Sequence, residues 1–384
     1  MSEALTGARI FDGARPVDGH AIVIEGARIV ALVPERNLAA GMAKRRVEGL
    51  IAPGFIDCQV NGGGGVLFND VRTVEGIAAI GDAHRRFGTT GFLPTLITDS
   101  REHMASAIAA VAEAMAANVP GLLGVHLEGP FLNPERKGVH DPSLMRTMDE
   151  ADIALATSLR SGKTLITLAP EKVPAATIAR LVQAGLIVSA GHTAASYETI
   201  QAARQAGLSG FTHLFNAMPP LAGRAPGPVG AALDDPDVWC GLIVDLHHVA
   251  AASLRIAVAA KGWERMMLVT DAMPSVGSDA TSFSLLGQIV TRKDGKLTTA
   301  DGTIAGSNLD MATAVRNSVN HLGLPLEVAL HMASRAPAEF LGLGGELGRI
   351  APGHRASLVL LDDNLGVVET WIDGVSSRDK KKGG

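Results

Sequence analysis

Cysteine is scarce in this sequence, and several kinds of segment are missing from it. The two cysteines, Cys58 and Cys240, each stand inside an apolar run and are too few for a disulfide framework, so we expect buried, reduced thiols. The first residues lack a basic segment followed by an apolar one, so no signal peptide is expected. No apolar run reaches the roughly 18–20 residues of a membrane span. These absences favour a cytoplasmic protein with no membrane partner.

A basic stripe is also missing. The formal net charge is −5 and the 34 Lys and Arg residues are scattered, whereas a nucleic-acid-binding protein concentrates positive charge on one face. We therefore expect no nucleic-acid partner. The basic run at 380–382 is interpreted as a solvated tail. With 47% hydrophobic and 19% charged residues the chain is globular, and its 384 residues suit a large barrel with a smaller companion domain.

Both ends of the chain have the pattern of short β-strands separated by turns. Alternating apolar residues punctuated by glycine predict strands at 7–11, 21–25 and 28–33, and again at 347–350, 357–361 and 367–373. Either end alone is too small to form a stable sheet with a buried face. We therefore expect residues 1–52 and 347–384 to fold together into one small β-sandwich domain, with the two termini close to each other.

Between these ends, residues 53–346 alternate short apolar runs with alanine-rich helical stretches. We expect strands at 54–60, 90–98, 122–127, 165–169, 186–190, 210–214, 240–244 and 266–270, and helices at 74–86, 102–117, 173–184, 197–206 and 250–260. Eight such units predict an α/β fold of the (β/α)8 TIM-barrel type. The alternative is an open doubly wound sheet, but no Gly-x-Gly-x-x-Gly turn follows the first strand. The glycines at 62–65 are expected to let backbone approach a ligand.

Polar side chains gather where the expected strands end, which is where barrel enzymes carry their catalytic groups. These strand ends fall at 57–61, 126–130, 191–193, 212–216, 245–248 and 270–271. One carboxylate and two imidazoles at converging strand ends would suit Zn²⁺ or a similar divalent ion and leave a position for water. A single histidine at such a place is more often structural. Three potential ligands and a further Asp at the same end of one barrel favour a metal site.

Several segments resemble the N-acetylglucosamine-6-phosphate deacetylase family of the amidohydrolase superfamily. The matching stretches are 53–57, 126–131, 138–140, 190–193, 212–218, 269–272 and 305–307, and the most specific are His-Leu-Glu-Gly-Pro and Thr-His-Leu-x-Asn-Ala-Met. The resemblance implies a distorted TIM barrel with a split β domain. It also implies hydrolysis of N-acetylglucosamine 6-phosphate to glucosamine 6-phosphate and acetate, in amino sugar catabolism and cell-wall sugar recycling, by a homodimer.

The same resemblance assigns roles to individual residues. The metal ligands fall on Glu128, His192 and His213, and the catalytic acid/base falls on Asp271, with His140 polarising the acetyl carbonyl. The substrate-binding positions are Val139, His140, Asn216, Ala217, Arg224, His248, Ile304, Ala305 and Gly306. Two-metal relatives carry His-x-His at the end of the first strand, where this chain has Gln59 and Asn61, and amides are poor Zn²⁺ ligands. We therefore expect one divalent ion per chain, Zn²⁺ in preference to Fe²⁺, Mn²⁺ or Co²⁺.

Arg224 is the candidate phosphate ligand, because its planar guanidinium can bind a phosphate in a bidentate manner. It lies in a Pro- and Gly-rich stretch, 218–230, which is expected to be a shaped loop. His248 could assist, whereas His247 should point elsewhere and be structural. Two alternatives stay open: N-acetylgalactosamine 6-phosphate or another amide as substrate, and an inactive barrel that serves as a binding protein.

Overall fold

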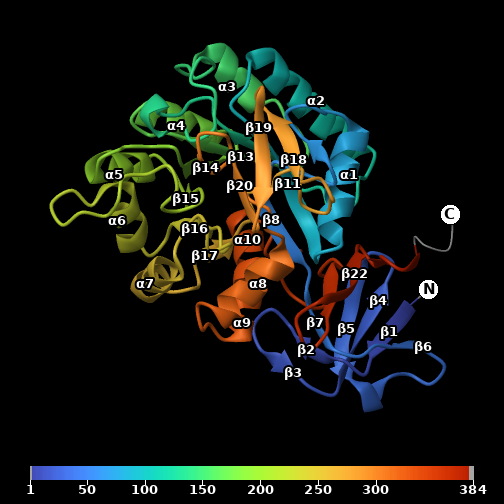
Figure 1. Cartoon of the computed structure of the whole chain (residues 1–384). Helices are drawn as coiled ribbons and strands as arrows, with labels where there is room; N and C mark the ends of the chain where they lie inside the picture. Colours follow the sequence, from blue (N-terminus) through green and yellow to red (C-terminus); the bar gives the residue numbers. More distant parts are fainter. Residues whose placement is uncertain (1, 380–384) are drawn as a thin grey trace.

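A closed ring of parallel strands forms the centre of the molecule in the computed structural model, which describes residues 2–379 (Figure 1). Its strands are β8 (Phe55–Val60), β11 (Thr89–Ile97), β12 (Gly124–Glu128), β13 (Lys163–Leu168), β14 (Ile187–Ala190), β15 (Gly210–Phe211), β16 (Trp239–Leu242) and β17 (Met266–Leu268). Each of these strands except the last pairs in parallel with the next strand in this list. All eight expected strands are present, which confirms the predicted TIM barrel.

The ring closes through a short seam between its first and last strands. β17 ends at Leu268, and the chain beyond it meets β8 through an isolated parallel bridge between Val60 and Ala272. Further across the seam, the Thr270 hydroxyl donates to the buried carboxylate of Asp57 at 2.5 Å. Few ladder bonds join the two edges, so the barrel is distorted at this point, as the family resemblance implied.

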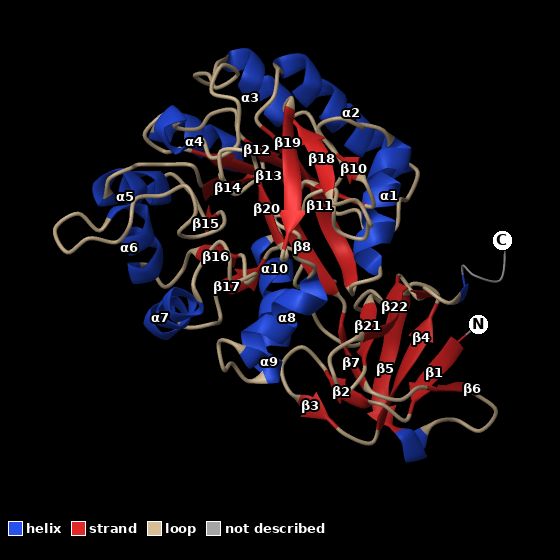
Figure 2. Cartoon of the chain, in the orientation of Figure 1, coloured by secondary structure: helices blue, strands red, loops and turns tan. Residues whose placement is uncertain are grey.

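Ten α-helices are present among residues 2–379, and Figure 2 shows those of the barrel arranged around its strands. They are α1 (Val74–Arg85), α2 (Arg101–Ala116), α3 (Glu150–Ala156), α4 (Ala175–Gln183), α5 (Tyr197–Gln205), α6 (Gly227–Asp234), α7 (Ala251–Lys261), α8 (Met311–Asn320), α9 (Leu326–Ala333) and α10 (Arg335–Phe340). Side-chain caps fix several starts: Thr73, Ser100 and Ser196 each accept a backbone N–H in the first turn. None of these helices is long and apolar enough to cross a membrane.

Both chain ends build the smaller domain, as predicted. One sheet has the order β5-β4-β1-β6, from β1 (Ser2–Thr6), β4 (His20–Glu25), β5 (Arg28–Pro34) and β6 (Ala43–Arg46). The other has the order β23-β22-β21-β7-β2-β3, from β2 (Arg9–Phe11), β3 (Pro16–Val17), β7 (Leu50–Pro53), β21 (Leu358–Leu361), β22 (Val367–Ile372) and β23 (Val375–Ser376). Antiparallel pairing of β7 with β21 joins the two ends of the chain. Side chains from both ends, including Ile22, Ile51 and Trp371, share one core.

The structure corrects four local expectations. Residues 347–350 are not a strand, although Ile350 is buried and its N–H donates to the Asp12 carbonyl. The stretch expected to be a loop at 218–230 ends in helix α6, with Pro228 in its first turn, where proline is tolerated. β15 stops at Phe211 instead of 214, and β1 and β6 were not expected. The basic run at 380–382 lies outside the described residues, and the domain boundaries stay predictions.

A three-stranded antiparallel sheet that the sequence did not predict follows β17. It consists of β18 (Ser282–Leu285), β19 (Gln288–Lys293) and β20 (Lys296–Thr298). Figure 1 shows it lying across the barrel. Leu285, Val290 and Leu297 form an apolar cluster with Ile97, at the end of β11, and with Met273. This sheet therefore supplies one wall to the mouth of the barrel.

Candidate metal and active site

Three potential metal ligands lie where barrel strands end. Glu128 is the last residue of β12, and His192 and His213 follow β14 and β15 by two residues. His192, His213 and Asp271 have backbone φ angles of 48°, 34° and 52°, respectively. Such angles are unfavourable for residues other than glycine, persist only where the surrounding structure enforces them, and are typical of functional sites. All three side chains line the same cavity.

The ligand atoms of these residues converge. Glu128 Oε1 lies 3.3 Å from His192 Nε2 and 3.0 Å from His213 Nε2, and the two Nε2 atoms are 3.0 Å apart. Ligand atoms that share a tetrahedral ion at about 2.0–2.1 Å are roughly 3.4 Å from one another. The observed separations are slightly shorter than this. One oxygen and two nitrogens form a set of ligand atoms that suits a divalent transition metal. These residues therefore fit a metal ion.

Hydrogen bonds indicate which imidazoles can be ligands. The Arg136 carbonyl can only accept, so His192 Nδ1 donates to it at 2.8 Å, and His192 Nε2 keeps a lone pair for a metal. His140 has the opposite arrangement: the Thr98 N–H donates to His140 Nδ1 at 3.3 Å, so the neutral ring has its proton on Nε2. Ligand atoms of Glu128, His140 and His192 also lie within 4.8 Å of one another. We nevertheless favour His213 as the third ligand. The Nε2 atom of His140 carries the proton of the neutral ring, so it has no lone pair with which to bind a metal.

Burial and charge set the protonation of this cluster. Loss of hydration, followed by the charge of His192, lowers the pKa of His140 to about 3, so its ring is neutral. Burial opposes ionisation of Glu128, but its contacts with the imidazoles of His192 and His213 outweigh it and hold the pKa of the carboxyl well below the usual range. Burial also disfavours the charged form of His213, but Glu128 outweighs this and raises its pKa. A carboxylate that holds a proton on a neighbouring imidazole is a site where a cation can replace the proton.

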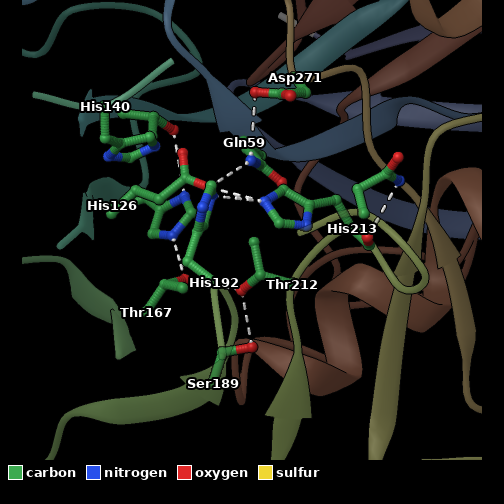
Figure 3. A network of polar contacts seen from close by, with 12 residues as sticks. Gln59, His126, His140, Thr167, Ser189, His192, Thr212, His213 and Asp271 are labelled. Carbon is green, nitrogen blue, oxygen red and sulfur yellow. Dashed lines mark hydrogen bonds and ion pairs between the residues drawn. The ribbon is translucent and has the colours of Figure 1, made fainter. Parts of the chain in front are cut away.

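Two amides lie at the end of the first barrel strand and contact the carboxylates of the site; Figure 3 shows Gln59 beside Asp271. Gln59 Nε2 lies 3.1 Å from Glu128 Oε1 and 3.2 Å from Asp271 Oδ1, and Asn61 Nδ2 lies 2.6 Å from the same Asp271 oxygen. Because carboxylates only accept, both amides present their NH₂ groups here and act as donors. Burial, and then the charge of Glu128, raise the pKa of Asp271 to about 6.

A cavity of about 210 Å³ brings together most of the residues predicted for the site. Besides the three ligands and Asp271, it is lined by Val139, His140, Asn216, Ala217, His248, Ile304 and Gly306. Two predicted residues do not line it: Ala305 is fully buried in the apolar cluster under the added sheet, and Arg224 is exposed on the loop before α6. Ile97 and Met273 also line the cavity and were not predicted.

His248 is held by a carboxylate that the sequence analysis did not assign. His248 Nδ1 lies 2.6 Å from Asp245 Oδ2, and the backbone N–H groups of His247 and His248 both donate to Asp245 Oδ1. Burial opposes the charge of Asp245, but the contact with His248 outweighs it and lowers the pKa of the carboxyl. The Asp245 carboxylate thus fixes the ring that faces the cavity, while His247 is exposed, in keeping with its predicted structural role.

Two further supporting residues follow β11 and β13, strand ends at which the sequence predicted no site residue. Thr98 follows β11 and orients His140 through its N–H and its hydroxyl. Glu171 follows β13 and accepts hydrogen bonds from Thr193 and Ala194, directly after the ligand His192. The strand-end rule that located Glu128 and Asp271 would have located both.

Comparison with known proteins places the chain in a family. The amidohydrolase family model matches residues 50–376, and a NagA composite domain matches residues 4–51. The chain belongs to the amidohydrolase family. Amidohydrolases are metal-dependent hydrolases, so the chain is an enzyme of this class and the Glu–His–His cluster is its candidate metal site. The alternative of an inactive binding protein is therefore set aside.

Individual relatives share most of the chain. An N-acetylgalactosamine-6-phosphate deacetylase from Shewanella sp. (strain ANA-3) is 48% identical over 330 residues, 86% of this chain and 84% of the relative. An N-acetylglucosamine-6-phosphate deacetylase from Haemophilus influenzae is 35% identical over 387 residues, 97% and 99% of the two chains. The crystal structure of N-acetylglucosamine-6-phosphate deacetylase from Pasteurella multocida has a TM-score of 0.95 and 35% identity, covering 98% of this chain and all of that one.

The two possible ligand sets give different results on mutation. We expect Glu128→Ala, His192→Ala and His213→Ala each to lose tightly bound metal, because each removes one of the three converging metal ligands. His140→Ala should keep the metal and lose activity, because His140 donates a hydrogen bond. Metal content measured after dialysis against a weak chelator separates the two sets: loss from His140→Ala with retention by His213→Ala would exchange the two residues in the ligand set.

Proposed function

We propose that this chain removes the acetyl group from N-acetyl-D-glucosamine 6-phosphate by hydrolysis and forms D-glucosamine 6-phosphate and acetate, in amino sugar catabolism and cell-wall sugar recycling. One arrangement carries the proposal: the proton acceptor Asp271 and the N–H donor His140 line the same cavity as the three potential metal ligands. The H. influenzae relative named for this activity is similar along nearly the whole chain.

Hydrolysis of an amide needs an activated water, stabilisation of the oxyanion and a proton for the leaving nitrogen. Glu128, His192 and His213 would hold the metal ion. A bound ion supplies Lewis acidity, which lowers the pKa of water and polarises a carbonyl. We propose one ion per chain, Zn²⁺ in preference to Fe²⁺, Mn²⁺ or Co²⁺, because Gln59 and Asn61 present donors where two-metal sites need ligands.

Asp271 is the proposed general base and acid. Both amide contacts fall on its Oδ1 atom, which leaves Oδ2 to exchange protons with the attacking water. A pKa of about 6 keeps the carboxyl ionised at neutral pH and still basic enough to accept a proton. Asp271 then delivers this proton to the amine nitrogen as the C–N bond breaks.

His140 is the proposed donor to the acetyl carbonyl. Thr98 occupies its Nδ1, so the N–H at Nε2 is free to face the substrate. The low pKa of the ring keeps it a neutral donor that does not exchange protons during the reaction. A donor directed at the developing oxyanion typically contributes about 3–4 kcal/mol to transition-state stabilisation.

The 6-phosphate needs cationic partners, and His248 and Arg224 are the proposed ones. His248 lines the cavity and is fixed by Asp245. Arg224 is exposed on the loop before α6, outside the cavity lining. That position fits a homodimer in which Arg224 of one chain reaches the phosphate site of the other. The homodimer and the cytoplasmic location are part of this proposal.

A second candidate substrate is N-acetylgalactosamine 6-phosphate, because a 48% identical relative is named as its deacetylase. The two sugars differ only in the configuration at C4. Acetate release from the two epimers, measured side by side with metal content on the same sample, tests the proposal. We expect about one tightly bound ion per chain and a kcat/KM that is higher for the gluco epimer. A higher kcat/KM for the galacto epimer would select the second candidate, and no release from either would refute both.

Asp271→Asn should separate proton transfer from metal binding. Asparagine keeps the shape of the side chain but accepts no proton near neutral pH, so we expect kcat to fall at least about 10²-fold with metal and substrate binding nearly unchanged. Wild-type kcat/KM should rise with pH as Asp271 ionises, at or below pH 6, since a bound cation lowers a carboxyl pKa. This acid limb should be lost or displaced in the mutant. Parallel loss of metal and activity would make Asp271 a ligand.

Arg224→Ala should impair hydrolysis of the sugar phosphate far more than that of plain N-acetylglucosamine, because only the phosphate offers a charge to pair. Arg224→Lys is the matched control, since it keeps the charge and loses the bidentate fork. If Arg224 serves the partner's site, mixed Arg224→Ala and Asp271→Asn dimers should regain some activity. Equal losses on both substrates would assign Arg224 a structural role, and no recovery despite proven subunit exchange would place the whole pocket in one chain.

A further inference from the structure

Glu171 is a carboxylate at the mouth of the barrel to which neither the sequence nor the reaction gives a role. It lies in the turn after β13 and is half-buried. Its Oε1 accepts from the Asn133 side chain at 2.9 Å and from the Ala194 N–H at 2.7 Å, and its Oε2 accepts from the Thr193 hydroxyl at 2.5 Å. None of these donors is charged, so the contacts position groups and neutralise no charge.

These contacts join the loops after β12 and β14 on both sides of His192. Thr193 and Ala194 directly follow this ligand in the chain. The Asn133 N–H donates to the His192 carbonyl at 3.0 Å, and the Asn133 carbonyl accepts from Arg136 N–H at 2.8 Å. The Arg136 carbonyl in turn accepts from His192 Nδ1 at 2.8 Å. These bonds already link the loop after β12 to His192, and Glu171 adds a second link between the same loops, from the Asn133 side chain to Thr193 and Ala194.

These two links together support two features that a metal ligand needs. The backbone φ of His192 is 48°, an unfavourable angle that must be enforced from outside the residue. The bond from Nδ1 fixes the tautomer that leaves the Nε2 lone pair free. Without Glu171, the Asn133 side chain, the Thr193 hydroxyl and the Ala194 N–H each lose a partner, and the two loops are joined at fewer points.

We propose that Glu171 is a positioning residue that holds His192 in the orientation and tautomer needed for metal binding, by clamping the loops after β12 and β14. The proposal rests on the metal site of the proposed function, but not on the identity of the substrate. Glu171 acts through Asn133, Thr193 and Ala194 and does not touch the ion.

The clamp depends on geometry more than on charge, and this separates two variants. In Glu171→Gln, the amide oxygen can accept from Asn133 and Ala194, while the NH₂ group donates to the Thr193 hydroxyl, whose direction reverses. All three contacts can survive. In Glu171→Ala all three are lost. The matched control is Glu150→Ala, which removes an exposed carboxylate at the start of α3 that pairs with Arg180.

The test is metal affinity of the apoprotein, measured by titration of Zn²⁺ in competition with a chelating dye. We expect Glu171→Ala to bind about 10–100-fold more weakly than wild type, the usual effect of losing a residue that supports a ligand. Glu171→Gln and Glu150→Ala should stay close to wild type. Hydrogen exchange of the Ala194 amide should accelerate in Glu171→Ala alone, because its acceptor is gone.

Wild-type affinity in Glu171→Ala would overturn the proposal, and so would an equal loss in Glu171→Gln, which would indicate charge instead of geometry. If Glu171→Ala does not fold, Thr193→Val removes one contact and should weaken metal binding by a smaller factor; unchanged affinity there would also overturn the clamp. A wild-type protein that binds Zn²⁺ but releases no acetate would refute the proposed function and leave the clamp intact.

Discussion

Closure of the barrel at one weak seam is the constraint on which the active site depends. Asp57 spans this seam: its carboxylate accepts from the Thr270 hydroxyl and N–H and from the Gln59 N–H. Burial raises the pKa of Asp57 to about 7, while these hydrogen bonds favour its ionised form. Beyond the seam, the Asp271 N–H donates to the Gln59 carbonyl, which brings the proton acceptor beside Gln59, whose side-chain amide contacts Glu128.

The floor beneath the ligands contains a chain of hydrogen-bonded side chains (Figure 3). Apolar side chains such as Leu165 and Phe211 lie beside it. His126 contacts Thr167 at 2.7 Å, Thr167 contacts Thr212 at 2.6 Å, and Thr212 donates to Ser189 at 2.9 Å. Buried polar groups are costly unless they are paired, and here they are paired with one another across four strands. The site is therefore supported from below by this network and from the sides by residues such as Thr98, Asp245 and Glu171.

The sequence predicted the repeating parts of the fold and the residues at strand ends, because both follow simple periodic rules. All eight barrel strands were located, and Glu128, His192, His213 and Asp271 lie around one cavity as the resemblance implied. The added sheet at 282–298 has no counterpart in the repeating pattern and could not be placed. The contacts of Asn133 and Arg136 with His192 could not be predicted either, because they are made by backbone groups whose direction depends on the tertiary fold.

Pairing of β7 with β21 also constrains the order in which the protein is made. The ribosome releases β7 before the barrel and β21 after it, so at roughly 5–20 residues per second the first strand waits on the order of tens of seconds for its neighbour. During that time the β7 edge and half of an apolar core are uncovered on the nascent chain, a state prone to misassociation. The smaller domain can therefore be completed only late in synthesis, after the whole barrel has left the ribosome.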